Sequence, residues 1–143
     1  MREQTINKQS EGQIIFDEKY FTSQKSTKFK FLYDSKSRNT VILVNIERGT
    51  SYEAKEFYDY VSNLLKKGQN KLIIDLESVY FIDSVFFGTL IKLLKETTKS
   101  NGYLSLIVNF KNKPEILTIN QFEGIFETYP NLFEALSHSK FVN

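Results

Sequence analysis

An aspartate followed directly by a serine is the pair of residues in this chain best placed to do chemistry. The four residues Phe81-Ile82-Asp83-Ser84 stand between an apolar run and an amphipathic segment. Asp83 is a good N-cap, because its carboxylate can accept hydrogen bonds from the free amides of a helix's first turn. Ser84 then takes the first helical position, where the positive end of the helix dipole would stabilise an added phosphate. Ser84 is therefore a candidate phosphorylation site. The alternative is a small polar residue that only begins a helix.

Other kinds of reactive site find little support in the sequence. The chain has no cysteine, which excludes disulfides, thiolate catalysis and cysteine-ligated metals. His138 is the only histidine, and nothing in its spacing pairs it with Ser84 as base and nucleophile. There is no Gly-rich phosphate loop, and the carboxylates lack metal-ligand spacing. We therefore expect no catalytic residue, no metal and no cofactor, and a protein that is not an enzyme.

The elements around Asp83 and Ser84 are expected to be a buried strand and a helix. Leu72 to Leu76 form an apolar run interrupted only by Asp75, which is typical of a strand inside a sheet. After Ser84, one helical face is predicted by spacing, and it carries Phe87, Leu90, Ile91 and Leu94. Phe86 lies off that face. It either points outward, where an aromatic side chain could anchor a partner, or belongs to a second core face.

The rest of the chain predicts further strands and helices in alternation. Residues 29–33 and 40–46 favour a strand hairpin, and residues 103–108 favour a strand parallel to the central one, with a right-handed crossover. Thr50 and Glu53 form a capping box that begins a helix ending before Gly68. A short helix is expected over residues 112–119. A C-terminal helix capped by Asn131 and Glu134 is expected to dock on the sheet through Leu132, Phe133 and Leu136.

This order of elements, with Asp83-Ser84 before a helix that contains Gly88, resembles the STAS domain of anti-sigma factor antagonists from about Lys28 to His138. The resemblance implies an α/β fold with a mixed sheet and helices mainly on one face. In that family the serine at the position of Ser84 is phosphorylated by an anti-sigma factor that is also a kinase.

The chain departs from the family's pattern at two places. The family usually follows Asp-Ser with Ser or Thr and then Gly, whereas this chain has Val85 and Phe86. The family also carries a Gly-Glu-Leu-Asp-like segment after the second strand. The matching stretch here is Glu47-Arg48-Gly49-Thr50, in which Thr50 or Ser51 is the nearest substitute for the aspartate.

The resemblance implies a regulatory protein-binding module in a bacterial partner-switching pathway. Its partners would be an anti-sigma factor that is also a serine kinase, and a serine phosphatase. Ser84 would be the phosphorylation site, and the partner-binding residues would be Asp83, Val85, Phe86, Thr50 and Ser51. Three alternatives stay open: a scaffold that is not phosphorylated, a transporter-associated subunit, and a small-ligand sensor or enzyme with a cavity beside the N-terminal segment.

Composition bounds the remaining expectations. A length of 143 residues with 41% hydrophobic and 25% charged residues fits one globular domain. Residues 1–27 are expected to be a partly disordered extension before a domain of residues 28–143, with an edge strand or a short helix at residues 14–16 and 20–21. A net charge of +2 gives no case for nucleic acid. Neither a membrane span nor a signal peptide is recognisable, so we expect a cytoplasmic protein with no membrane partner.

Overall fold

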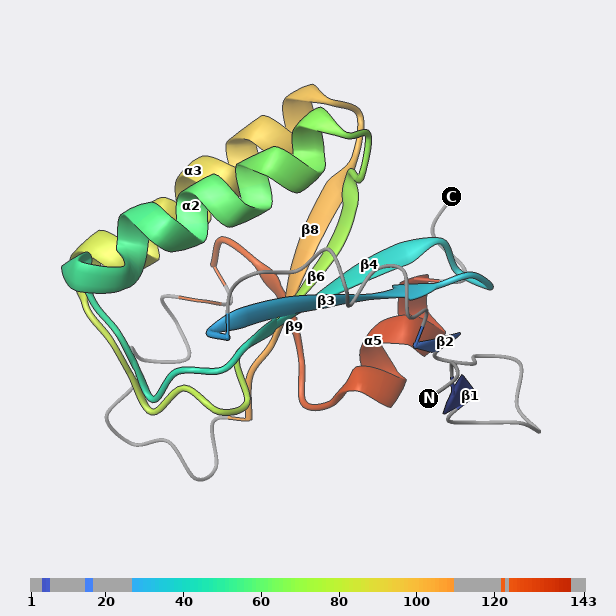
Figure 1. Cartoon of the computed structure of the whole chain (residues 1–143), viewed down its shortest axis with the longest axis horizontal. Coiled ribbons are helices and arrows are strands. Elements are labelled where there is room, and N and C mark those ends of the chain that lie inside the picture. The colour runs from blue at the N-terminus through green and yellow to red at the C-terminus, as the bar shows by residue number, and fades with distance from the viewer. Residues whose placement is uncertain (1–3, 6–14, 17–26, 110–121, 123, 140–143) are drawn as a thin grey trace.

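The computed structural model describes residues 4–5, 15–16, 27–109, 122 and 124–139, and these build a seven-stranded mixed sheet with helices on both faces (Figure 1). The strand order is β1-β2-β3-β4-β6-β8-β9. The strands are β1 (Gln4–Thr5), β2 (Ile15–Phe16), β3 (Phe29–Asp34), β4 (Asn39–Val44), β6 (Lys71–Asp75), β8 (Tyr103–Ile107) and β9 (Glu127–Tyr129). β6 therefore lies inside the sheet, as its apolar run predicts.

The pairing of the strands follows the predicted topology. β3 and β4 form an antiparallel hairpin in register from Phe29 opposite Val44 to Asp34 opposite Asn39. β4, β6, β8 and β9 are all parallel to one another. Parallel neighbours need a long crossover, and α2 (Ser51–Lys66) and α3 (Ser84–Lys99) supply the crossovers into β6 and β8. The predicted hairpin and parallel pair are confirmed.

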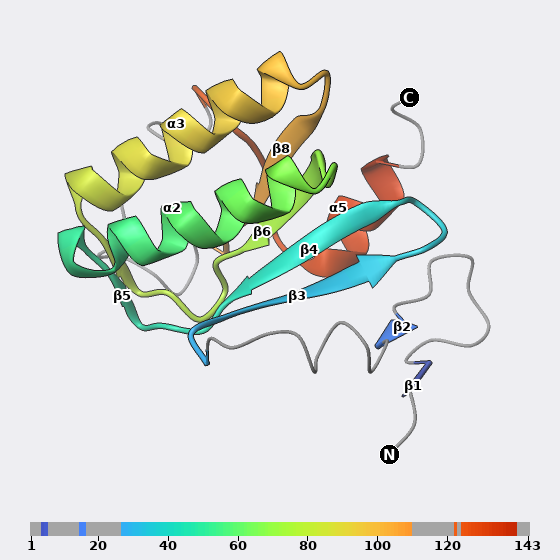
Figure 2. The same ribbon diagram turned by 45° about the horizontal axis from the view of Figure 1, so that its top comes forward.

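The sheet has a separate apolar core on each face. α2 and α3 lie side by side over one face, and α5 (Leu132–Ser139) covers the other (Figures 1 and 2). The second core joins Leu136 to Val41 and Ile73. Two of these three helices thus share a face, as expected. Phe133 was predicted to dock but is 67% exposed, because it lies about 100° around the helix from Leu132, while Ala135 takes the buried position.

The buried face of α3 is rotated from the predicted one. Its fully buried residues are Phe86, Leu90, Leu93 and Thr97, whereas Phe87, Ile91 and Leu94 are only partly buried. The apolar pattern did not predict that Thr97 is buried, because threonine is polar. Its buried hydroxyl is satisfied by donating to the Leu93 carbonyl at 2.6 Å. Phe87 instead packs edge-on against Phe122, with ring centroids 5.2 Å apart.

Both long helices end in a left-handed residue whose turn leads into the next strand. The residue after the C-cap is Gly68 in α2, with φ 93°, and Asn101 in α3, with φ 62°. Gly68 therefore ends α2 as predicted. The two turns meet: Tyr103 N donates to the Asn70 carbonyl at 2.9 Å. Gly102 must be a glycine, because a Cβ there would lie 1.9 Å from that carbonyl oxygen.

At the N-terminal side, the choice between an edge strand and a short helix is decided for Ile15 and Phe16. Ile15–Phe16 forms a strand, with Ile15 opposite Tyr33 of β3 in an antiparallel pair, so this stretch extends the sheet and is not a helix. The apolar residues at 20–21 and the predicted helix at 112–119 lie outside the described residues. The division of the chain at residue 27 stays a prediction.

Candidate functional site

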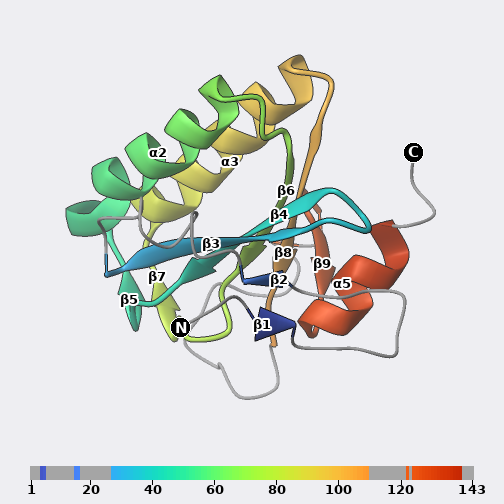
Figure 3. The same ribbon diagram turned by 45° about the vertical axis from the view of Figure 1, so that its right-hand side comes forward.

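A small second ladder brings together the two segments that lead into α2 and α3. β5 (Arg48–Gly49) and β7 (Phe81–Ile82) pair in parallel, with Arg48 opposite Phe81 and Gly49 opposite Ile82 (Figure 3). The Asp83 amide also donates to the Gly49 carbonyl at 2.9 Å. Each strand has two residues, too few to show a period of two, so the sequence did not predict them. The ladder places the starts of the two helices next to each other.

The Asp83 carboxylate joins these two helix starts. Its Oδ1 accepts a hydrogen bond from Phe86 N at 2.9 Å, which is the predicted N-cap of α3. Its Oδ2 accepts a second hydrogen bond from Ser51 N, also at 2.9 Å, in the first turn of α2. Asp83 is thus confirmed as a cap, and it also fixes the position of one helix relative to the other.

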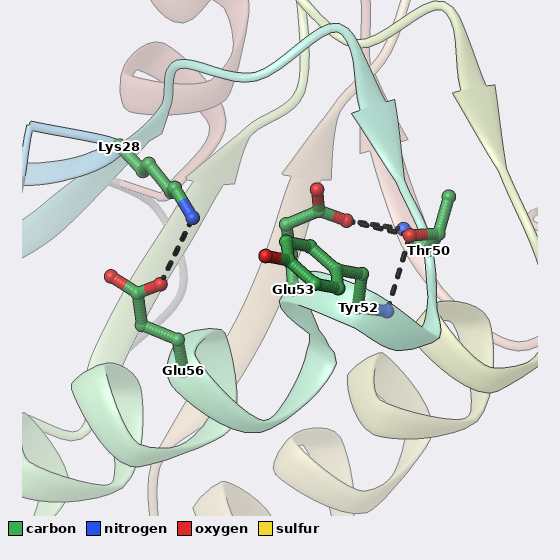
Figure 4. Close-up of polar contacts among 5 residues, drawn as sticks. All are labelled: Lys28, Thr50, Tyr52, Glu53 and Glu56. Carbon is green, nitrogen blue, oxygen red and sulfur yellow. Dashed lines mark hydrogen bonds and ion pairs between the residues drawn. The ribbon is translucent and has the colours of Figure 1, made fainter.

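Thr50, one of the two nearest substitutes for the family's aspartate, caps α2. Its Oγ1 accepts from Tyr52 N at 3.2 Å, and its own amide donates to Glu53 Oε1 at 3.0 Å (Figure 4). These reciprocal bonds confirm the predicted capping box. Lys28 reaches α2 from the start of β3 and pairs with Glu56 at 3.2 Å (Figure 4). The site is therefore built on two well-capped helix starts.

Ser84 is exposed at the first position of α3. Apolar and aromatic side chains of the two joined segments share this exposure: Val85 is 51% exposed, Tyr80 51% and Tyr52 86%. Val85 and Ser51 were predicted as partner-binding residues, and both are exposed, whereas Tyr52 and Tyr80 were not among the predicted residues. The available signal was that neither tyrosine belongs to an apolar stripe. Exposed aromatic residues are typical anchors of protein interfaces.

Phe86 points into the core, which decides for the second of its two alternatives and corrects its inclusion among the partner-binding residues. Its side chain is fully buried, and its ring stacks on that of Phe57 in α2, with centroids 4.9 Å apart. It also fills the space beneath β5, since a Cβ on Gly49 would lie 2.9 Å from Phe86 Cδ2. Phe86 therefore cannot touch a partner in this conformation, and it leaves the Ser84 hydroxyl uncovered.

The remaining candidate residues lie apart from Ser84. Asp75 Oδ1 accepts a hydrogen bond from Glu77 N at 2.9 Å, the structural role expected for it. His138 is on α5, across the sheet from α2 and α3, with its ring centroid 5.3 Å from that of Tyr129. Within the described ranges, no three histidine or carboxylate side chains are grouped to hold a metal ion. In the same ranges, no helix has both the length and the apolar character needed to cross a membrane.

Comparison with known proteins identifies the fold and the family. The family model for the STAS domain matches residues 36–135, more than half of the chain. The chain belongs to the STAS domain family. A protein of Thermotoga neapolitana, provisionally named as an anti-sigma factor antagonist homologue, is 28% identical over 93 residues, covering 65% of this chain and 79% of the relative.

Two solved structures share the fold of this STAS domain. A provisionally named anti-sigma factor antagonist of Thermotoga maritima superposes with a TM-score of 0.65 at 22% identity, covering 80% of this chain and 96% of that one. An anti-sigma factor antagonist (STAS) domain protein of Planctomyces limnophilus gives the same TM-score and identity, covering 78% and 97%. The predicted α/β fold with a mixed sheet is confirmed.

One departure from the STAS pattern, Phe86, contacts Gly49 of the stretch in which the other departure lies. The Phe86 ring occupies the space that a side chain on residue 49 would fill, since a Cβ there would lie 2.9 Å from Phe86 Cδ2. Phe86 is thus a buried core residue whose ring is accommodated by the glycine, and it does not crowd the serine.

Proposed function

We propose that this STAS domain is an anti-sigma factor antagonist whose binding is switched by phosphorylation of Ser84. The observation that carries the proposal is the exposure of Ser84 at the capped start of α3, with Phe86 turned into the core beneath it. A kinase needs an acceptor hydroxyl at the surface, and Ser84 meets this requirement. The provisional names of the relatives support the same class of partner.

In this scheme the unmodified domain binds an anti-sigma factor and releases the sigma factor that it holds. Val85, Tyr80 and Tyr52 supply exposed apolar and aromatic surface for the interface, with Thr50, Ser51 and Asp83 beside them. The anti-sigma factor is also the kinase, and a serine phosphatase reverses the modification. The domain contributes a hydroxyl and a surface, and it needs no catalytic group of its own.

Phosphorylation acts in this proposal through charge at a helix start. A phosphate brings about −1.5 to −2 charges at neutral pH. Within the domain those charges face the positive ends of two helices, because Asp83 holds the first turns of α2 and α3 together. In an interface shaped for a neutral hydroxyl, the same charges are desolvated and repelled, so the complex separates while the domain stays folded.

The test is incubation of the purified protein with ATP and the anti-sigma factor kinase of the same organism, followed by intact mass measurement. The wild type is expected to gain one phosphate, and Ser84→Ala to gain none. Ser51 is the matched comparison, since it is an exposed serine at the first position of the other helix. Ser51→Ala is expected to gain one phosphate, as the wild type does. If Ser51→Ala were the only variant to gain none, the phosphate would be on Ser51 at the start of α2 and not on Ser84.

A second candidate is a scaffold that binds the same class of partner without being phosphorylated. The observation that favours it is the capping of α2 by Thr50, in the stretch where the family carries an aspartate and this chain has only Thr50 or Ser51 as a substitute. Stable binding of the kinase by the wild type, with no phosphate gained over the course of the reaction, selects this candidate and rejects the switch.

A further inference from the structure

The side of α3 that faces away from the core has an unusual composition. Seven residues of α3 are exposed, and five of them follow one another along this side from the candidate site: Ser84, then Gly88, then Lys92, Lys95 and Lys99; the other two are Val85 and Thr98. The fully buried residues of α3, Phe86, Leu90, Leu93 and Thr97, occupy the opposite side. We call Ser84, Gly88, Lys92, Lys95 and Lys99 the outer face of α3. It combines a glycine one turn beyond the serine with a row of lysines.

Gly88 is not required by the fold. A Cβ at this position would meet nothing within 4 Å, and its φ is not positive. Glycine is among the least favourable residues in a helix interior, because it loses the most conformational freedom. A helix-favouring residue would therefore fit and stabilise α3. The absence of such a side chain at residue 88 is explained if another molecule packs closely on α3 at this point, because a side chain there would keep that molecule at a distance.

The charges of the two helices leave the lysine row unbalanced. The carboxylates of α2 and α3 are engaged elsewhere: Glu53 with Thr50, Glu56 with Lys28, Asp59 with Lys55, and Glu96 with Tyr58. Those hydrogen bonds from Tyr58 to Glu96 raise the pKa of the phenol. Lys92 lies over the Tyr58 ring at 4.4 Å from its centroid. Lys95 and Lys99 are exposed and form no ion pair with any described residue.

We propose that the outer face of α3 docks an acidic surface of the anti-sigma factor, with its backbone close to Gly88 and its carboxylates along Lys92, Lys95 and Lys99. This inference rests on the proposed function and specifies the chemistry of the partner. It also connects the docking to the switch, since a phosphate on Ser84 stands at the end of the same face. An acidic surface that the lysines attract is repelled by that phosphate.

The experiment measures binding of the anti-sigma factor kinase to wild type and variants by surface plasmon resonance, without ATP, at about 0.05 M and about 0.3 M salt. Lys95→Glu is expected to weaken binding about tenfold at the lower salt and less at the higher, because attraction between exposed charges is screened. Lys36→Glu is the matched control: it makes the same charge change at an exposed turn residue of the β3–β4 hairpin, and it is expected to bind within about twofold of wild type.

Gly88→Gln tests the close approach separately. Because glutamine favours helices and a Cβ here meets no atom within 4 Å, the melting temperature of the variant is expected to rise by roughly 2–4 °C, while its binding weakens by about tenfold or more. A folded, more stable variant that binds as well as wild type would contradict the docking of α3, as would equal binding by Lys95→Glu and Lys36→Glu.

The outcomes separate this inference from the proposed function. Binding and phosphorylation of the wild type with no effect of Lys95→Glu or Gly88→Gln overturn the docking face alone. Stable binding that Lys95→Glu weakens, without phosphate gain, supports the docking face and overturns the switch. A wild type that neither binds nor is phosphorylated overturns both.

Discussion

The contact between Gly49 and Phe86 predicts a strong coupling between two distant positions of the sequence. Replacing the buried Phe86 with alanine alone leaves a cavity beneath β5 and is expected to cost about 3–5 kcal/mol. Gly49→Leu alone must place even its Cβ 2.9 Å from Phe86 Cδ2, and such overpacking costs about 1–3 kcal/mol. If the effects were independent, the double variant would lose about 4–8 kcal/mol, most of the stability of an ordinary domain.

Because the leucine fills the space that the ring vacates, we expect the double variant to be more stable than Phe86→Ala alone. The coupling free energy should then be at least about 2 kcal/mol, within the range measured for residues in contact. Urea unfolding followed by circular dichroism gives the free energy of unfolding of all four proteins. φ at Gly49 is not positive, so leucine is compatible with its backbone.

Gly88 provides the matched control for this cycle. A Cβ at Gly88 meets no atom within 4 Å, so Gly88→Leu combined with Phe86→Ala should give additive changes. Additivity to within about 0.5 kcal/mol in the Gly49 cycle as well would refute the coupling through shared space.

Three further predictions concern the same framework. Asp83→Ala loses the hydrogen bonds to both Phe86 N and Ser51 N, and its free energy of unfolding in urea should fall by about 2–3 kcal/mol. Asp83→Asn, which still caps a helix, should lose only about 1 kcal/mol. Equal losses in the two variants would contradict the bridging role. Gly102→Ala should lower the melting temperature by at least about 5 °C, since its Cβ would clash with a carbonyl oxygen. Burial raises the pKa of Tyr60 above its ordinary value of 10.0, so its neutral form stabilises the fold fully below pH 10 and this contribution falls as the pH rises further. The free energy of unfolding of Tyr60→Phe should therefore fall less steeply with pH above pH 10 than that of the wild type. Identical slopes would contradict this.

The sequence predicts the large elements well because each has a strong local signal. The apolar run at residues 72–76 and the β3–β4 alternation specify strands, and the Thr50 and Asp83 caps specify where two helices begin. These signals arise from residues close together in the sequence, so they can be recognised without knowledge of the tertiary contacts. The family resemblance adds the mixed sheet with helices mainly on one face, and it is confirmed by the match to the STAS family model.

The failures concern side chains whose direction depends on distant residues. Phe86 has an apolar neighbour on the chain in Phe87, and only the positions of Phe57 and Gly49 decide which ring is buried more deeply. The β5–β7 ladder is invisible for a similar reason, since its strands are held by residues more than thirty positions apart. The second hydrogen bond of Asp83 to Ser51 N also depends on that ladder. Local patterns identified the candidate serine but not the surface around it.

The contact between positions 49 and 86 restricts which residues the two positions can carry together. Two small side chains leave an empty space there and two large ones overfill it, so either pair is expected to be less stable than one small and one large residue. Substitutions at these sites should therefore be inherited together across relatives, and a graft of the serine loop between homologues should carry residue 49 with it.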